Sequence, residues 1–254
     1  NYRWFFQAIK WPVEQTLAGF DAGLNWLHPA VVIVLFAFAA WKFSGKGLAI
    51  FTIVALVFIG TLGIWSDTMT TLAMVLASVV FCAVVGIPLG IASGRSDRVE
   101  QSIRPLLDAM QTTPSFVYLV PVVMLFSVGN VAGVLATIIF AIPPIIRLTS
   151  LGIRQVHPEL VEAAQAFGAT PWQVLRMVQI PLALPTILAG LNQTIMMALS
   201  MVVIAALIGA GGLGSPVILG LNTLDIGRAV IGGLGIVLMA IVLDRITQSM
   251  AQKK

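Results

Sequence analysis

The sequence predicts an all-α integral membrane protein whose chain crosses the bilayer about seven times. Two properties of the composition carry this prediction: 59% of the 254 residues are apolar and only 9% are charged. Soluble chains average about 45–50% apolar and about 25% charged residues, so this chain has too few charges to cover a water-facing surface. The third observation is that the charges are spaced, which leaves uncharged stretches long enough to cross a membrane.

The uncharged stretches predict where each span lies, because a membrane-crossing helix needs about 20 mostly apolar residues. The first three uncharged stretches, 22–41, 47–66 and 68–94, are expected to hold one span each. The stretch 109–146 is broken at 127–130 and is expected to hold two. The stretch 177–224 holds one span, and 229–243 crosses if the flanking charges reach water. The expected spans are 24–41, 47–65, 68–93, 112–127, 131–146, 186–208 and 229–243.

The basic residues predict the orientation, since cytoplasmic loops are rich in lysine and arginine. With the N-terminus outside, 11 of the 14 basic residues fall on the inside, and only Arg3, Lys10 and Arg228 lie outside. We therefore expect an external N-terminus and a cytoplasmic C-terminus.

Residues 1–27 differ from the spans, because aromatic residues alternate with charges there. Aromatic side chains favour the membrane–water boundary. We expect an amphipathic helix on the outer surface, followed by a transmembrane domain over 28–254. The aromatic residues are Trp4, Phe5, Phe6, Trp11, Phe20 and Trp26.

The inside segment 147–185 is predicted to hold two short helices joined by a tight turn. Pro158 suits the first turn of a helix, and Gly168 is placed to end it. Thr170 and Gln173 have the spacing of a capping box, which starts the second helix. We expect the prolines at 181 and 185 to stop that helix before the next span.

This segment also resembles the EAA loop of ABC importer permeases. The family pattern is EAA-x3-G-x9-I-x-LP, and the chain departs from it only by Val178 for isoleucine and Ile180 for leucine. The resemblance implies a helix that docks on a cytoplasmic ATPase subunit; an ordinary surface hairpin is the alternative. The matching residues are Glu162, Ala163, Ala164, Gly168, Ile180 and Pro181.

A narrower resemblance, to permeases of glycine betaine/proline betaine importers, covers nearly the whole chain. It rests on the segments 104–114, 116–121, 143–149, 192–194, 198–205 and 211–214. Permeases for choline share much of this sequence, so choline or another quaternary ammonium compound is the alternative substrate.

The resemblance implies the type I ABC importer permease fold in the bacterial inner membrane. The implied partners are a second copy of the chain, two ATPase subunits that bind ATP and Mg, an external binding protein that is periplasmic or lipid-anchored, and membrane lipid. No cofactor is expected in this chain itself. A flexible outer turn containing Gly211, Gly212 and Gly214 is expected to face the binding protein.

Polar groups in the spans suggest a path that holds the solute weakly, since amides, hydroxyls and aromatic faces can contact a quaternary ammonium. The alternative for Asn192 and Gln193 is hydrogen bonding between helices. The glycines at 86, 90 and 94 predict close helix packing, either within one subunit or against a second copy. The expected path residues are Gln111, Thr112, Thr113, Tyr118, Asn192, Gln193, Met197 and Ser200.

Several function classes find no support in the sequence. It contains no phosphate-binding loop of the form GxxxxGK[ST], no metal-ligand cluster and no nucleophile–base–acid set. Its basic residues form no stripe for nucleic acid. An ion-coupled carrier would need a titratable relay within the spans. We therefore predict a transport subunit rather than an enzyme, driven by energy from another subunit.

Overall fold

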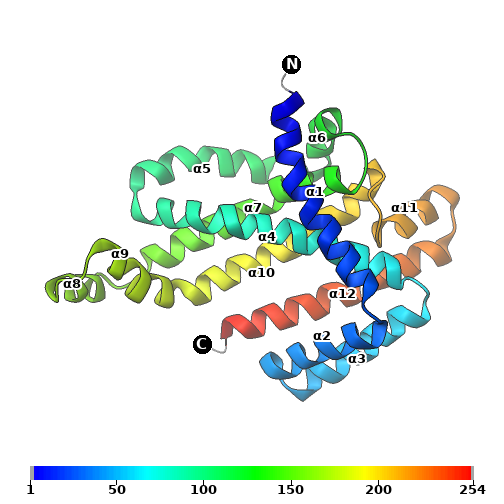
Figure 1. Ribbon diagram of the computed structural model, residues 1–254, viewed down its shortest axis with the longest axis horizontal. Helices are drawn as coiled ribbons and strands as arrows, with labels where there is room; N and C mark the ends of the chain where they lie inside the picture. Colours follow the sequence, from blue (N-terminus) through cyan, green and yellow to red (C-terminus); the bar gives the residue numbers. More distant parts are fainter. Residues whose placement is uncertain (1–2, 253–254) are drawn as a thin grey trace.

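The computed structural model describes residues 3–252, and every regular element in that range is a helix (Figure 1). Helices suit this apolar chain because each satisfies its own backbone hydrogen bonds inside lipid. The elements are α1 (Arg3–Trp26), α2 (Pro29–Ser44), α3 (Lys46–Thr61), α4 (Trp65–Arg95), α5 (Asp97–Thr112), η1 (Ser115–Tyr118), α6 (Leu119–Phe126), α7 (Asn130–Arg154), α8 (Pro158–Ala166), α9 (Pro171–Val174), the π-helical turn η2 (Leu175–Gln179), α10 (Ile180–Ala205), η3 (Ala206–Ile208), α11 (Gly214–Thr223) and α12 (Ile226–Gln252).

Helices α4, α7 and α10 pack along one another at the centre of the molecule (Figure 1). The stripe of Gly86, Gly90 and Gly94 explains how closely α4 approaches α7. A Cβ atom added at Gly86 would lie 2.4 Å from Ile145, and one added at Gly90 would lie 2.5 Å from Thr149. Small residues four apart permit such close approach in membranes. The interpretation of this stripe as packing within one subunit is confirmed.

The sequence predicted about seven spans. Among the described residues, four helices are long and apolar enough to cross a membrane: α4, α7, the continuous helix from α9 through η3, and α12. Two bent pairs raise the number to six if each pair counts as one span: α1 with α2, bent by 106°, and α5 with the η1–α6 segment, bent by 107°. The span predicted at 47–65 corresponds to α3, which at 16 residues is shorter than the usual length of about 20.

The segment 112–127 is not the single helix that the sequence predicted. Pro114 disfavours helical backbone at the residue before it, and Thr113 accordingly takes an extended conformation with φ −73° and ψ 127°. After this break, η1 and the eight-residue α6 fold back toward α7. The span predicted at 112–127 is therefore a bent segment in the structure and not one continuous helix.

A second difference is that Pro181 and Pro185 do not stop a helix. The chain is helical from Pro171 to Ile208 without a break. In the π turn, the Ile180 N–H donates to the Leu175 carbonyl, five residues earlier, just before the first of these prolines. Such a wide turn adds one residue to the helix, which continues through both prolines.

Helix α1 runs across α4 rather than along it (Figure 1). Val13 and Leu17 are buried in the core cluster, and the Thr70 hydroxyl of α4 donates to the Asp21 carboxylate at 3.1 Å. The position of α1 on the outer membrane surface stays a prediction. The side chains of Arg3, Phe5 and Phe6, and all of Lys253 and Lys254, lie outside the described residues.

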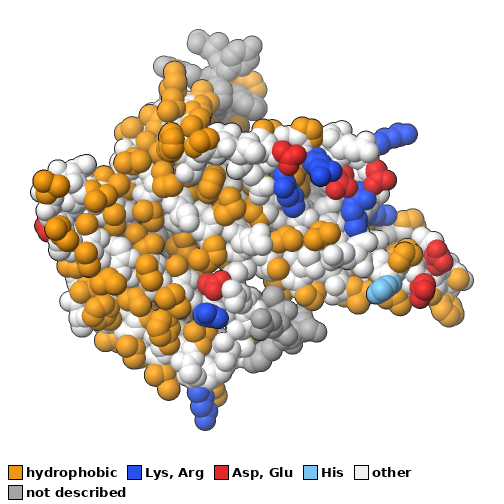
Figure 2. All heavy atoms as spheres, turned by 180° about the vertical axis from the view of Figure 1, so that it is seen from behind, with side chains coloured by type: hydrophobic (Ala, Val, Ile, Leu, Met, Phe, Trp, Pro, Cys, Tyr) orange, Lys and Arg blue, Asp and Glu red, His pale blue; other side chains and the backbone are white. Residues whose placement is uncertain are grey.

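The two ends of the molecule differ in surface chemistry. Helices α8 and α9 lie at one end and α11 lies at the other (Figure 1). Figure 2 shows hydrophobic side chains covering most of the face toward the α11 end, whereas charged side chains gather toward the α8 end. This distribution suits a protein that meets lipid over most of its length.

Candidate functional site

The hairpin formed by α8 and α9 projects from the α8 end of the molecule (Figure 1). Helix α8 has no buried residue. Gly168 forms the turn with φ +82°, and the Ala169 N–H donates to the Ala164 carbonyl at 3.0 Å. The predicted capping box is confirmed, because the Thr170 N–H donates to Gln173 Oε1 at 2.7 Å and the Gln173 N–H donates to Thr170 Oγ1 at 3.4 Å.

The residues of the EAA pattern fall in two places. Glu162 and Ala163 are exposed on α8, and Gly168 lies at the tip. Ile180 and Pro181 lie at the start of α10, at the base of the hairpin. The pattern therefore marks both the projecting helix and its attachment to a span.

Sequence reasoning missed the large apolar side chains of this hairpin. Phe167 is 93% exposed and Trp172 is 63% exposed. The position of Phe167 next to the turn glycine was visible in the sequence, but only the structure shows that nothing among the described residues covers it. Exposed aromatic side chains are enriched at protein contact surfaces.

The predicted path residues divide between two regions. Gln111 and Thr112 are exposed at the end of α5, and the Thr113 hydroxyl donates to the Ala109 carbonyl at 2.7 Å. The Tyr118 hydroxyl donates to the Met110 carbonyl at 2.6 Å, and its ring lies 6.2 Å from that of Phe140 on α7. Tyr118 thus fixes the bent segment against α7.

On α10, Asn192 is engaged in hydrogen bonds between helices. Its amide donates to Asp244 on α12 at 3.0 Å, and the Thr247 hydroxyl donates to its carbonyl oxygen. The helix-bonding interpretation is confirmed for this residue. Gln193 and Ser200 are instead exposed, and Met197 is half-buried between them on the same helix face, since residues four and seven apart share a face.

The glycine turn at the α11 end is packed rather than flexible. The Gly211 N–H donates to Asn130 Oδ1 at 2.7 Å, and the Leu213 N–H donates to Thr71 Oγ1 at 2.8 Å. Gly212 has φ +85°, and a Cβ atom there would lie 2.4 Å from the Thr71 hydroxyl. Gly214 is also buried. The expectation of flexibility was wrong, because α4 and α7 hold this turn.

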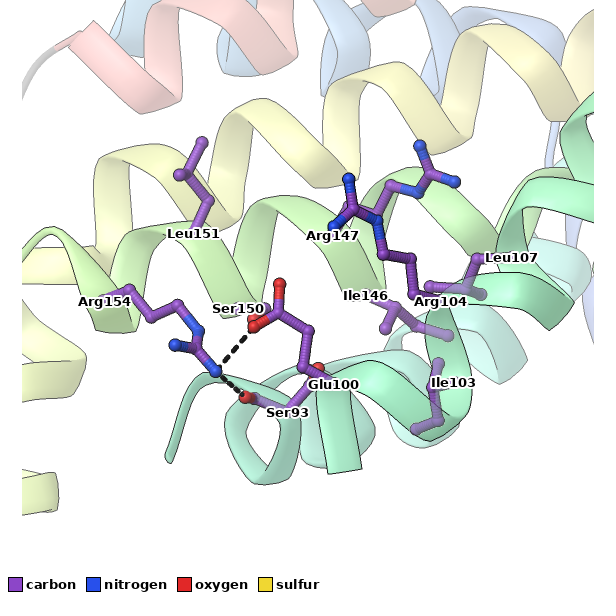
Figure 3. Close-up of a pocket in the computed structure, with 10 residues that line it drawn as sticks. All are labelled: Ser93, Glu100, Ile103, Arg104, Leu107, Ile146, Arg147, Ser150, Leu151 and Arg154. Atoms are coloured by element: carbon purple, nitrogen blue, oxygen red, sulfur yellow. Dashed lines mark hydrogen bonds and ion pairs between the residues drawn. The ribbon is translucent and has the colours of Figure 1, made fainter. Parts of the chain in front are cut away.

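Arginine side chains tie α5 to α7 at the α8 end, a feature that sequence reasoning missed. Arg154 forms ion pairs with Asp97 at 2.7 Å and Glu100 at 2.6 Å, and donates to the Ser93 carbonyl at 2.9 Å (Figure 3). Arg147, two helical turns earlier, pairs with Asp108 of α5. Helix α5 is therefore bound at two levels to the helix that leads into the hairpin.

Arg154→Gln is expected to lower the free energy of unfolding by about 1–2 kcal/mol, because two partly exposed ion pairs and a bond to a buried carbonyl are lost. Scanning fluorimetry of the purified chain in detergent checks this as a lower melting temperature. Arg176→Gln, at an exposed arginine of the π turn, is the matched control and should melt like the wild type. Equal melting of the Arg154 variant would show that the ties contribute nothing.

These features define a class of protein. The chain is a multi-pass helical membrane protein with an exposed helical hairpin at one end. More particularly, it belongs to the family described as binding-protein-dependent transport system inner membrane components, whose profile matches residues 86–254.

Relatives extend this match over the whole chain. It is 56% identical over 252 residues, 99% of the chain and 71% of the relative, to the glycine betaine/proline betaine transport system permease protein ProW of Escherichia coli K12. It is 48% identical, over 98% of the chain and 89% of the relative, to the glycine betaine transport system permease protein OpuAB of Bacillus subtilis 168. Against the trimethylamine N-oxide transport system permease protein TmoV of Pelagibacter ubique the identity is 41%, over 91% of the chain and 32% of the relative.

Solved structures agree on the fold. The inward-facing MetNI methionine ABC transporter superposes with a TM-score of 0.61 at 25% identity, covering 72% of this chain and 91% of that one. An amino acid ABC transporter with histidines gives 0.64 at 21% identity, covering 79% and 98%. The chain therefore has the type I ABC importer permease fold. It is a transport subunit of the inner membrane and not an enzyme.

Proposed function

We propose that this chain forms the membrane path of an ATP-driven importer for glycine betaine, proline betaine or a closely related compatible solute. The observation that carries the proposal is the 56% identity over 99% of the chain to a permease named for these two solutes. Choline or another quaternary ammonium compound is the second candidate, and the 41% identity to a trimethylamine N-oxide permease shows that related permeases serve other methylated solutes.

The α8–α9 hairpin is the proposed docking element for a cytoplasmic ATPase subunit. Glu162, Ala163, Ala164 and Gly168 would enter the contact, and Ile180 with Pro181 would pass its motion to α10. The absence of any buried residue on α8 supports this role. ATP and Mg would bind the ATPase, with no cofactor in this chain.

Two copies of the chain would pair about a two-fold axis, as most membrane and soluble homo-oligomers do. ATP-driven closure of two ATPases would bring the two hairpins together and swing the spans between inward-facing and outward-facing states. The path would run along the polar residues of the bent segment, and along those of α10 that are not engaged between helices: Gln111, Thr112, Thr113, Tyr118, Gln193, Met197 and Ser200.

In the orientation that we propose, the α11 end lies outside and the α8 end lies in the cytoplasm. The excess of charged side chains at the α8 end supports this orientation. An external binding protein, periplasmic or lipid-anchored, would then meet the turn of Gly211, Gly212 and Gly214, whose packing on α4 and α7 suits a rigid contact.

Reconstitution tests the proposal directly. The tagged chain should co-purify with an ATPase subunit, and the complex in proteoliposomes should hydrolyse ATP faster when binding protein loaded with glycine betaine is added. Labelled glycine betaine should accumulate only with ATP. Uptake driven by an ion gradient without ATP, or ATP-driven uptake of choline in preference to betaines, would contradict the proposed function.

A further inference from the structure

A cavity of about 300 Å³ lies between α4, α5 and α7 at the α8 end (Figure 3). This volume is at the small end of the range for ligand sites. Its walls combine charged and apolar side chains, and α4 contributes only Ser93 near its end. The charged residues that line it are Glu100, Arg104, Arg147 and Arg154.

The three arginines of the cavity are not equally neutralised. Arg154 takes two carboxylates, Asp97 and Glu100, and Arg147 takes Asp108. Arg104 forms no ion pair with any of the described residues. Figure 3 shows the guanidinium groups of Arg104 and Arg147 pointing in the same direction. Arg104 is therefore the one arginine of the cavity without a carboxylate partner among the described residues, and it is in a position to bind an anion.

A second unpartnered donor lies in the same wall. The Ser150 hydroxyl is buried and has no hydrogen-bond partner among the described residues, and the residue is only 6% exposed. Leaving a buried polar group unpaired is unfavourable, and an acceptor entering the cavity would relieve the cost. Arg104 and Ser150 are thus two unpartnered donors that could both donate hydrogen bonds to an oxyanion in the cavity.

The position of the cavity favours an anion that arrives from water. Arg147 lies seven residues before the end of α7, about 10 Å along the helix axis. Its side chain is 40% exposed and that of Asp108 is 54% exposed. Charged side chains at membrane depth face water or protein rather than acyl chains. This exposure favours a small soluble anion as the ligand, and the phosphate of a lipid is the other source of the same chemistry.

Resting on the proposed function, we propose that this cavity binds the carboxylate of the transported betaine before its release. Arg104 supplies the charge-assisted hydrogen bond, and Ser150 donates a second one. A betaine carries a carboxylate beside its quaternary ammonium group, whereas choline carries a hydroxyl. The cavity would thus discriminate between the two classes of solute inside the permease itself.

Saturation-transfer NMR on the permease–ATPase complex tests the proposal. The complex is placed in phosphatidylcholine nanodiscs without binding protein, and glycine betaine and choline are the two probes. The wild type should give a glycine betaine signal at millimolar concentration and none with choline. Arg104→Gln should weaken the apparent affinity about tenfold, the usual effect of losing a charged hydrogen bond.

Two further variants keep the test independent of folding. Ser150→Ala removes only the unpartnered hydroxyl, so it should weaken binding without lowering the melting temperature. Arg98→Gln, at an exposed arginine on the same helix but outside the cavity, should bind like the wild type. Wild-type binding by Arg104→Gln, equal signals from choline, or a signal that appears only with phosphatidylglycerol would overturn the proposal.

The outcomes separate this inference from the proposed function. If the complete wild-type transporter accumulates glycine betaine but its permease–ATPase complex gives no betaine signal, only the cavity assignment fails. If the complete wild-type transporter accumulates no glycine betaine, the uptake assay alone shows that the proposed function is wrong.

Discussion

Phe167→Ala is expected to reduce ATP-driven uptake at least tenfold while leaving the chain folded in the membrane. The side chain is 93% exposed at the tip of the α8–α9 hairpin, so its removal costs the isolated chain little. In a docked complex it would be a buried aromatic anchor, and such residues contribute about 2 kcal/mol or more to binding. The measurements are the amount of ATPase subunit that co-purifies and the solute taken up per ATP hydrolysed.

The control for this prediction is Phe38→Ala, which truncates an exposed phenylalanine of α2, away from the hairpin. It should leave uptake unchanged. Glu162→Gln and Gly168→Ala should lose coupling as well, the second because φ +82° costs a residue with a Cβ atom about 1–2 kcal/mol. Normal coupled uptake in all three hairpin variants would refute the docking role.

Gly90→Ala is expected to cost about 1–3 kcal/mol of folding stability, the usual penalty for overpacking a core. The added methyl would lie 2.5 Å from the Thr149 Cβ and 2.7 Å from the Ile146 carbonyl oxygen. Because one of these neighbours is backbone, α4 and α7 would have to separate. Fluorescence-detected gel filtration after heating gives the expected readout, an earlier loss of the monodisperse peak.

Gly23→Ala is the matched control, because it places the same methyl on a helix where no atom lies within 4 Å. This variant should be as stable as the wild type or slightly more stable, since alanine is the better helix former. If both variants melt together, close contact between α4 and α7 does not limit stability.

Local patterns predicted the local features of this fold well. The capping box of Thr170 and Gln173 and the glycine stripe on α4 depend on residues within one or two turns, so the sequence determines them directly. The positions of α4, α7 and α12 followed from uncharged length in the same way.

Other features depended on competition that a single sequence does not display. Proline ended a helix before Pro114 but not at Pro88, Pro105 or Pro181, where the helices continue. Arg154 meets a carbonyl 61 residues earlier in the chain, and Arg147 meets a carboxylate 39 residues earlier. No spacing rule connects residues so far apart, and the exposure of Phe167 likewise follows only from what surrounds it.

The π turn between the hairpin and α10 sets the rotation of α10 about its own axis relative to the hairpin. One extra residue in an α-helix turns everything beyond it by about 100°. The wide turn at Leu175–Gln179 therefore sets the angle at which the face bearing Gln193, Met197 and Ser200 is presented relative to the hairpin. Deleting one residue there would leave the side chains of both surfaces unchanged and yet rotate one surface against the other by about 100°.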